Sequence, residues 1–343
     1  MSSSITARRQ TILNIIVGEY IKTAVPVASD LIFRKYGLGV SPATIRNDMV
    51  FLEEEGYIAR PHTSAGCIPL DKGYRYYVES ISVDIELPLE EQHRIRDLFT
   101  HAEEEINRWL KLAAILMARL VGNAALVTFP KASQCRFKHL ELVSLHELLA
   151  MMVLVFRETL LKQQLLSFNQ PVTQEQLNNI AQKINSSYEG LTSVEISARK
   201  PESTMEEQRI TESVVDAMSA EDETEYSQPY LEGLRLMLGQ PEFANKDRIL
   251  NIMELVEAKD WLKPVLRLPH RDRGVQVVIG EESHDTATGD LSLVLSRYGI
   301  PKRASGTIGV IGPTRMDYRR AISTVGYMSE VLSELVAGVC HEE

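Results

Sequence analysis

The chain contains few cysteines and no long hydrophobic run. Its three cysteines are spread over 343 residues, so neither a metal-binding spacing nor a disulfide framework is expected. The longest apolar run, 148–156, is too short to cross a bilayer, and the first 30 residues lack the pattern of a secretory signal. These absences favour a cytoplasmic protein with no membrane partner.

Motifs of catalysis are also missing. Gly306, Gly309 and Gly312 are spaced by threes, which does not match a dinucleotide-binding fingerprint, and the sequence has no P-loop lysine. The eight histidines form no metal-ligand pattern, and no nucleophile–base motif is recognisable. We therefore expect no cofactor, no metal and no enzymatic activity.

Net positive charge is absent, since the formal net charge is −10, but the charges are unevenly distributed. Residues 1–80 hold nine Lys/Arg and eight Asp/Glu, whereas the rest of the chain holds 28 and 39. Attraction to phosphate depends on the local patch and not on the net charge. This distribution is compatible with DNA contact at the N-terminal end only.

The first 56 residues contain the patterns of three helices. Apolar residues recur at helical spacing over 6–22, and a second helix is expected over 29–36. Ser41 is a good N-cap residue, with Pro42 at the first position of a third helix that ends at Gly56. The third helix places apolar residues on one face and small or polar residues on the others, as a helix that enters the major groove does.

A hairpin is expected directly after the third helix. Strands at 57–60 and 67–70 enclose the turn-rich loop 61–66. Three helices followed by two strands is the order of a winged helix-turn-helix, which we place at 1–82. The alternative for the third helix is a solvated face in a simple three-helix bundle, because helix-turn-helix patterns have many false matches.

The candidate DNA-binding side chains lie at the start of the third helix and along the hairpin. We expect the following residues to contact DNA: Ser41, Thr44, Arg46, Asn47, Arg60, His62, Thr63 and Ser64. Arginine can pair with guanine and asparagine with adenine, so Thr44, Arg46 and Asn47 are candidates for base or phosphate contacts. Ser41 and the loop residues are candidates for contacts with the DNA backbone.

Three tyrosines follow the hairpin, in a helix that begins at Asp71. Tyr74, Tyr76 and Tyr77 can be interpreted as a platform on which bases stack. At this spacing, tyrosines more often pack between domains, and we favour packing.

Residues 83–343 alternate between strand-like and helical patterns. Expected in chain order are a helix over 88–120, strands at 124–129, 137–144, 148–156 and 160–168, a helix from 173 to 187, a polar helical region over 197–268, strands at 275–279, 291–295 and 307–311, and a helix over 317–339. Strands on both sides of a helical block predict one α/β domain, 88–196 with 269–343, that is interrupted by 197–268.

Six segments make the chain resemble a known family, the heat-inducible transcription repressors of the HrcA type. They are 41–49, 52–58, 61–66, 68–69, 71–78 and 308–318, the last of which reads IGVIGPTRMDY. The resemblance implies an α+β multidomain protein with an N-terminal winged helix-turn-helix, a GAF-like α/β domain and a helical inserted dimerisation domain.

The resemblance also implies a function. It implies a negative regulator of chaperone operons that binds double-stranded DNA, at the inverted repeat called CIRCE, as a homodimer and is released on heat shock. It further implies that the chaperonin GroEL promotes the DNA-competent state. A winged-helix regulator gated by a small molecule is the alternative, because GAF-like domains often bind ligands.

Two features need a separate interpretation. Cys67 stands where the family usually has arginine, and we favour a small residue in a strand over a redox switch because no partner cysteine is visible. Basic residues gather near the last family segment: Lys302, Arg303, Arg315, Arg319 and Arg320. They could bind an anion, but pairing within the protein or solvation is favoured.

Overall fold

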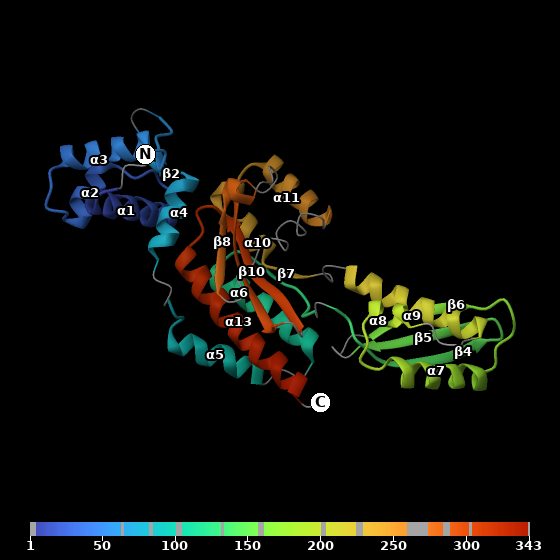
Figure 1. Ribbon diagram of the computed structural model, residues 1–343. Coiled ribbons are helices and arrows are strands. Elements are labelled where there is room, and N and C mark those ends of the chain that lie inside the picture. Colours follow the sequence, from blue (N-terminus) through green and yellow to red (C-terminus); the bar gives the residue numbers. More distant parts are fainter. Residues whose placement is uncertain are drawn as a thin grey trace. The chain divides into compact units, whose positions relative to one another are not determined.

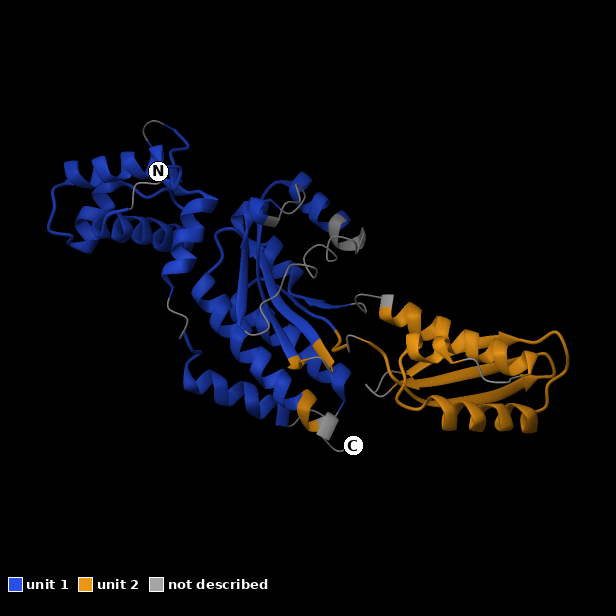
Figure 2. Ribbon diagram, viewed as in Figure 1, with its two compact units in different colours: residues 1–128, 229–298, 306–335 blue, residues 129–228, 299–305, 336–343 orange. Residues whose placement is uncertain are grey.

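The structure, a computed structural model, forms two compact units (Figure 2). Unit 1 comprises 1–128, 229–298 and 306–335, and unit 2 comprises 129–228, 299–305 and 336–343. The residues that the structure describes are 5–62, 65–81, 85–100, 105–131, 134–156, 161–199, 204–223, 229–258, 274–283, 289–301 and 304–341. No helix within these ranges is long and apolar enough to span a membrane.

Unit 1 begins with three helices and a short hairpin, at the blue end of the chain in Figure 1. The elements are α1 (Ala7–Thr23), α2 (Ser29–Tyr36), α3 (Pro42–Glu54), β1 (Ile58–Ala59), β2 (Ile68–Pro69) and α4 (Asp71–Ser80). They share a core of fully buried aliphatic side chains: Ile12, Leu13, Ile16, Ile32, Ile45, Leu52 and Ile58. β1 and β2 pair antiparallel, so this segment is a winged helix, as the sequence predicts.

A close backbone approach fixes how α4 leaves the hairpin. A Cβ atom on Gly73 would lie 2.2 Å from the carbonyl oxygen of Tyr57, so a larger residue would force α4 away from the hairpin. The same carbonyl accepts a hydrogen bond from the backbone N–H of Leu70 at 3.0 Å. Glycine is therefore required at this position for steric reasons.

The rest of unit 1 is built on a five-stranded sheet. Its strand order is β7 (Tyr230–Glu232), β3 (Ala124–Val127), β10 (Ala304–Pro313), β9 (Leu291–Ile300) and β8 (Val275–Ile279). Helix α6 (Ile106–Val121) packs on β3 and β7. Two further helices, α5 (Leu89–Thr100) and α13 (Tyr318–His341), lie side by side (Figure 1). Tyr327 Oη in α13 donates a hydrogen bond to the carbonyl oxygen of Gln92 in α5 at 3.0 Å.

Strand β3 lies inside this sheet, and all four of its residues are buried. Its neighbours come from distant parts of the chain: Val127 lies opposite Ile308 of β10 on one side and opposite Tyr230 of β7 on the other. The pairing with β10 joins residues that are separated by more than half of the sequence. The sheet therefore closes only when the last quarter of the chain is present.

Unit 2 contains a three-stranded antiparallel sheet and three helices. They are β4 (Phe137–His146), β5 (Leu149–Phe156), β6 (Leu161–Ser167), α7 (Gln174–Tyr188), α8 (Ser193–Ala198) and α9 (Met205–Glu223). Thr173 and Gln176 form a capping box at the start of α7, where the sequence predicts a helix. The side chain of Asn185 in α7 bonds to the backbone N–H (2.7 Å) and C=O (3.0 Å) of Leu140, which satisfies part of the β4 edge.

The two faces of this three-stranded sheet differ in their surroundings. Alternate strand residues are buried in one core with side chains of α7, α8 and α9; these are Phe137, Leu140, Leu142, Ala150, Met152, Leu154 and Phe156. The residues between them form the opposite face, which we call the open face: Glu141, Val143, Met151, Val153, Val155, Leu161, Gln163 and Leu165. No described element covers it, and Leu161 and Leu165 are 58% and 59% exposed.

The interruption of the α/β domain lies at different residues from those expected. The sequence suggests 197–268, but the strands between 137 and 167 pair only with one another, so the separate unit is 129–228. Helix α11 (Lys246–Ala258), which falls within the expected segment, belongs to unit 1. Hydrophobic periodicity identifies a strand but not the strand with which it pairs. Residues 259–268 lie outside the described part of the chain.

Two smaller differences from the expected elements occur within unit 1. The helix expected over 88–120 is divided between α5 and α6, with 101–104 not described. The expected helical region over 197–268 also contains a strand, β7, which is joined to the short helix α10 (Leu234–Leu238) by Gly233 at a φ of 77°. The left-handed backbone of this glycine allows the change from strand to helix.

Candidate nucleic-acid interface

Helix α3 begins where local chemistry requires. Ser41 Oγ accepts a hydrogen bond from the backbone N–H of Thr44 at 3.2 Å, and Pro42 occupies the first helical position. The hydroxyl oxygens of Ser41 and Thr44 are 3.0 Å apart. The two hydroxyls therefore lie together at the positive end of the helix dipole, where phosphate binds favourably.

The exposed face of α3 carries the two side chains most suited to reading bases. Arg46 and Asn47 are exposed, whereas Ile45 beside them is fully buried. Among the described residues, neither side chain has a hydrogen-bond or ion-pair partner. The structure thus brings Thr44, Arg46 and Asn47 together on the first turns of one helix, as the sequence predicts.

The hairpin residues that were expected to contact DNA differ in their surroundings. Arg60 is half-buried, lies 3.5 Å from Glu53 and bonds to the thiol of Cys67, so its guanidinium is engaged within the protein. His62 is exposed at the start of the loop. Thr63 and Ser64 lie outside the described residues.

Cys67 has the surroundings of a structural residue. It is 1% exposed, and its backbone exchanges hydrogen bonds with Val27 at 2.8 and 2.9 Å. Burial raises the pKa of its thiol, which lowers the thiolate fraction needed for oxidation or exchange. This environment agrees with a small packed residue and not with a redox switch.

Sequence reasoning missed Arg8 and Arg9, which lie in the first turn of α1 and contact α3. Their Nε atoms donate to the carboxylate of Asp48 at 2.6 and 3.1 Å. Asp48 is 2% exposed. Burial alone would raise the pKa of Asp48, but the hydrogen bonds from Arg8 and Arg9 bring it below its ordinary value. The only sequence signal for this contact is the pair of adjacent arginines, which does not indicate the residue that they bind.

A second buried carboxylate joins α1 to α2. Glu19 is 4% exposed and accepts hydrogen bonds from Lys35 Nζ at 2.8 and 2.9 Å and from Tyr36 Oη at 2.5 Å. These bonds lower the pKa of Glu19, and burial together with the same contact raises the pKa of Tyr36 to about 12. The carboxylate is therefore ionised at neutral pH and fixes the angle between the two helices.

The three tyrosines of α4 are packing residues. Tyr74 and Tyr77 are 2% and 8% exposed, and Tyr76 contacts the ring of Tyr57 edge to face with 5.9 Å between centroids. The Tyr74 ring lies 5.9 Å from that of Tyr318. Bases cannot stack on the buried rings of Tyr74 and Tyr77, which agrees with the packing interpretation, whereas Tyr76 is half-exposed.

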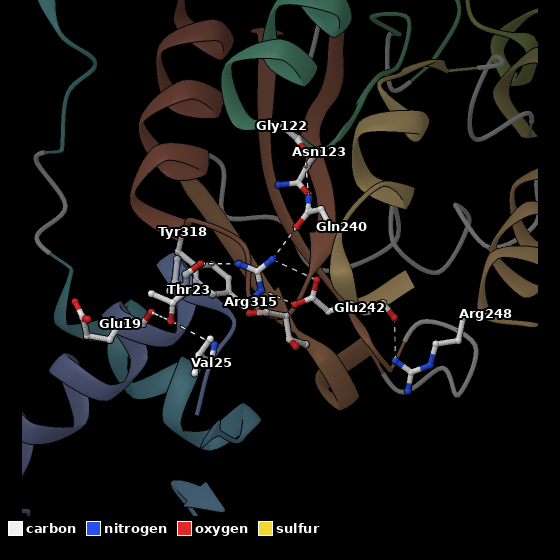
Figure 3. Close-up of polar contacts among 12 residues, drawn as sticks. Glu19, Thr23, Val25, Gly122, Asn123, Gln240, Glu242, Arg248, Arg315 and Tyr318 are labelled. Carbon is white, nitrogen blue, oxygen red and sulfur yellow. Dashed lines mark hydrogen bonds and ion pairs between the residues drawn. The ribbon is translucent and has the colours of Figure 1, made fainter. Parts of the chain in front are cut away.

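Arg315, in the turn between β10 and α13, ties α1 to the body of unit 1 (Figure 3). Its guanidinium donates to the carbonyl oxygen of Ile21 at 2.6 Å and pairs with Glu242 in η1 (Pro241–Phe243). Gln240 beside it donates to Asn123 Oδ1 at 2.6 Å. Pairing with Glu242 raises the pKa of Arg315, whose side chain is only 13% exposed.

Other members of the basic cluster are also engaged within unit 1. Arg320 pairs with Glu91 at 2.7 Å, and Arg319 Nε donates to Tyr77 Oη at 3.2 Å. Lys302 and Arg303 are not described. The three described arginines therefore agree with intramolecular pairing and not with an anion site.

A capped, exposed helix beside a β-hairpin wing defines a winged-helix DNA-binding protein. A DeoR-like helix-turn-helix domain matches residues 36–69, and the HrcA protein C-terminal domain matches residues 107–322. The chain belongs to the HrcA family of heat-inducible transcription repressors. Family membership confirms the prediction that it is a transcription repressor and not an enzyme.

Relatives match along almost the whole chain. Heat-inducible transcription repressors from Dehalococcoides mccartyi and Roseiflexus sp. are 46% and 41% identical, covering 97% and 98% of this chain and 96% of each relative. The repressor from Herpetosiphon aurantiacus is 38% identical and covers 100% of this chain and 98% of its own. A solved hypothetical protein shares the fold, with a TM-score of 0.59, 24% identity and coverage of 97% and 98%.

Proposed function

We propose that this chain represses chaperone operons in the cytoplasm, binds the CIRCE inverted repeat as a homodimer and leaves it on heat shock. The observation that carries the proposal is the exposed Arg46–Asn47 pair on the capped helix α3. A guanidinium pairs with guanine and a carboxamide with adenine in the major groove. Thr44 at the helix start and His62 in the wing would contact the flanking phosphates, as would Ser41, Thr63 and Ser64.

The open face of unit 2 supports the dimer. Val143, Met151 and Leu165 lie side by side across β4, β5 and β6, so an apolar surface crosses all three strands. Apolar side chains gathered on one sheet face are most stable when a second surface excludes water from them. We propose that two copies meet at this face, which makes unit 2 the dimerisation domain. A two-fold dimer presents two recognition helices and therefore suits an inverted repeat.

The five-stranded sheet with its helices supports the GAF-like assignment for the rest of unit 1, and its topology supports a role for GroEL. Strand β3 is apolar and buried, and its partner β10 is made more than half a chain later. Sheets that close over long sequence separations fold slowly and expose apolar surface meanwhile. Such a chain is a natural chaperonin client, and free chaperonin would maintain its active population.

A salt-controlled binding titration tests the proposal. Purified protein is titrated against a CIRCE-type repeat and a scrambled duplex of equal length, with and without GroEL. We expect a preference for the repeat of about a thousandfold or more, which is the lower range for specific DNA-binding proteins. Equal binding to both duplexes under both conditions would contradict it, and a small molecule that restored preference would instead favour a ligand-gated regulator.

A further inference from the structure

We propose that Arg8 and Arg9 form a further DNA-phosphate site whose guanidiniums are oriented by the buried carboxylate of Asp48. The inference rests on DNA binding by α3, and it assigns a function to residues on a different helix. We call the three residues the arginine clasp. Arg8 and Arg9 belong to α1, and Asp48 follows Asn47 directly in α3.

The geometry of Arg8 leaves one edge of its guanidinium free. Nε donates to Asp48 Oδ2 at 2.6 Å and Nη2 to Oδ1 at 3.3 Å, so the carboxylate occupies one side of the planar group. Arginine has five donors in a rigid fork. Nη1 has no acceptor among the described residues, and 47% of the side chain is exposed. The remaining donors therefore point away from Asp48 in a fixed direction.

Arg9 is held from two sides. Its Nε donates to Asp48 Oδ1 at 3.1 Å, and its Cζ lies 3.6 Å from the centroid of the Phe51 ring. The side chain is 27% exposed. A guanidinium that stacks on a ring and bonds to a carboxylate has lost most of its conformational freedom before any ligand arrives.

The charge of the clasp does not balance. One carboxylate faces two guanidiniums, so a unit of positive charge remains where α1 meets the buried face of α3. Backbone contacts of this kind set the register of a recognition helix in the groove, because they fix the protein against the phosphates on each side.

Substitutions separate orientation from charge. Arg8→Ala removes the free donors and should weaken binding to the repeat and to the scrambled duplex alike, by about tenfold, and lower the slope of log K against log salt by about 0.9. Asp48→Asn removes a negative charge, so an effect of net charge alone would tighten binding. We expect weaker binding, because the arginines lose their fixed direction. Arg119→Ala, an exposed arginine on α6, is the matched control and should change nothing.

Anisotropy titrations over a range of salt concentrations supply both quantities, with thermal melts to confirm folding. Arg8→Lys keeps the charge without the fork, and we expect it to retain the salt slope but to lose affinity. Wild-type affinity and slope in Arg8→Ala, or tighter binding in folded Asp48→Asn, would overturn the proposal. If the wild type shows no preference for the repeat, the proposed operator fails, whereas the effect of Arg8→Ala on the scrambled duplex still tests the clasp.

Discussion

Adjacent residues of α3 have opposite roles. Ile45 is fully buried in the winged-helix core, and Arg46, the next residue, is exposed. A substitution at Arg46 should therefore alter recognition without removing core packing. The same one-residue separation explains why the sequence alone identified Arg46 and Asn47: helical periodicity assigns faces within a helix reliably.

Arg46→Ala should weaken binding to the inverted repeat by about 1–3 kcal/mol if its contact with a base is bidentate, and should relax preference at one base pair. Titration against a set of single-base operator variants measures both effects. Arg34→Ala, which removes an exposed arginine from α2, provides the comparison within the same domain. An equal loss on every duplex would identify Arg46 as a phosphate contact.

Glu19 makes the winged helix sensitive to acid. Its pKa is lowered in the folded state, so its contribution to stability is fully present above the ordinary value of about 4.3 and is lost as pH falls through the folded value. Glu19→Gln should lower the melting temperature at pH 7. Between about pH 5 and pH 3, the melting temperature of the variant should fall less steeply than that of the wild type, because the paired carboxylate is no longer there to be protonated.

Thermal melts at a series of pH values measure this difference. Glu54→Gln, at an exposed position of α3, controls for the loss of a charge. Parallel acid profiles for wild type and Glu19→Gln would show that other carboxylates control the transition.

Elements with their own start and stop signals were predictable. Ser41 with Pro42 begins α3, and the Thr173 capping box begins α7, so both helices lie where the sequence predicts. Strand β7 was not recognised, because its identity depends on pairing with β3 more than a hundred residues earlier. The clasp was missed for the same reason, since Arg8 and Asp48 meet across 40 residues of sequence.

The link between α1 and the body of unit 1 depends on Arg315. Arg315→Ala leaves the Glu242 carboxylate and the carbonyl of Ile21 without their common donor. It should lower the free energy of unfolding by about 1–3 kcal/mol, the penalty for an unsatisfied buried polar group. Chemical unfolding measures it. Arg248→Ala is the comparison: this arginine is 50% exposed, donates to the backbone carbonyl of Glu242 and pairs with Asp290. Equal losses of unfolding free energy in the two variants would mean that the burial of Arg315 contributes nothing to stability.

The open face of unit 2 should control the oligomeric state. Leu165→Lys places a charge on the β6 edge of the open face, next to Met151, and desolvating that charge in an interface is expensive. We expect the variant to sediment as a monomer with an unchanged fold. Val194→Lys alters an apolar residue of α8 that is 72% exposed and outside the open face, and should remain dimeric. A dimeric Leu165→Lys would place the interface elsewhere.

At the scale of the whole molecule, the proposed release of DNA on heating would follow from marginal stability. We expect the temperature at which operator binding is lost to coincide with the unfolding transition and GroEL to restore binding after cooling, since mass action favours whichever state is bound. Calorimetry and anisotropy on the same sample compare the two temperatures. A protein that stays folded well above the heat-shock range but still releases DNA would contradict this mechanism.

The insertion of unit 2 also has a consequence for protein engineering. The chain departs after β3 and returns at β7, and Val127 and Tyr230 face each other directly in that antiparallel pair. Strands β3 and β7 are therefore paired like the two strands of a β-hairpin. A two-residue Asn-Gly turn has the geometry to connect them in place of the hundred residues between them. Residues 129–228, the largest part of unit 2, therefore form an insertion that can be exchanged between β3 and β7. If two copies meet through unit 2, as proposed, exchange of residues 129–228 would change which copies associate and leave helix α3 unchanged.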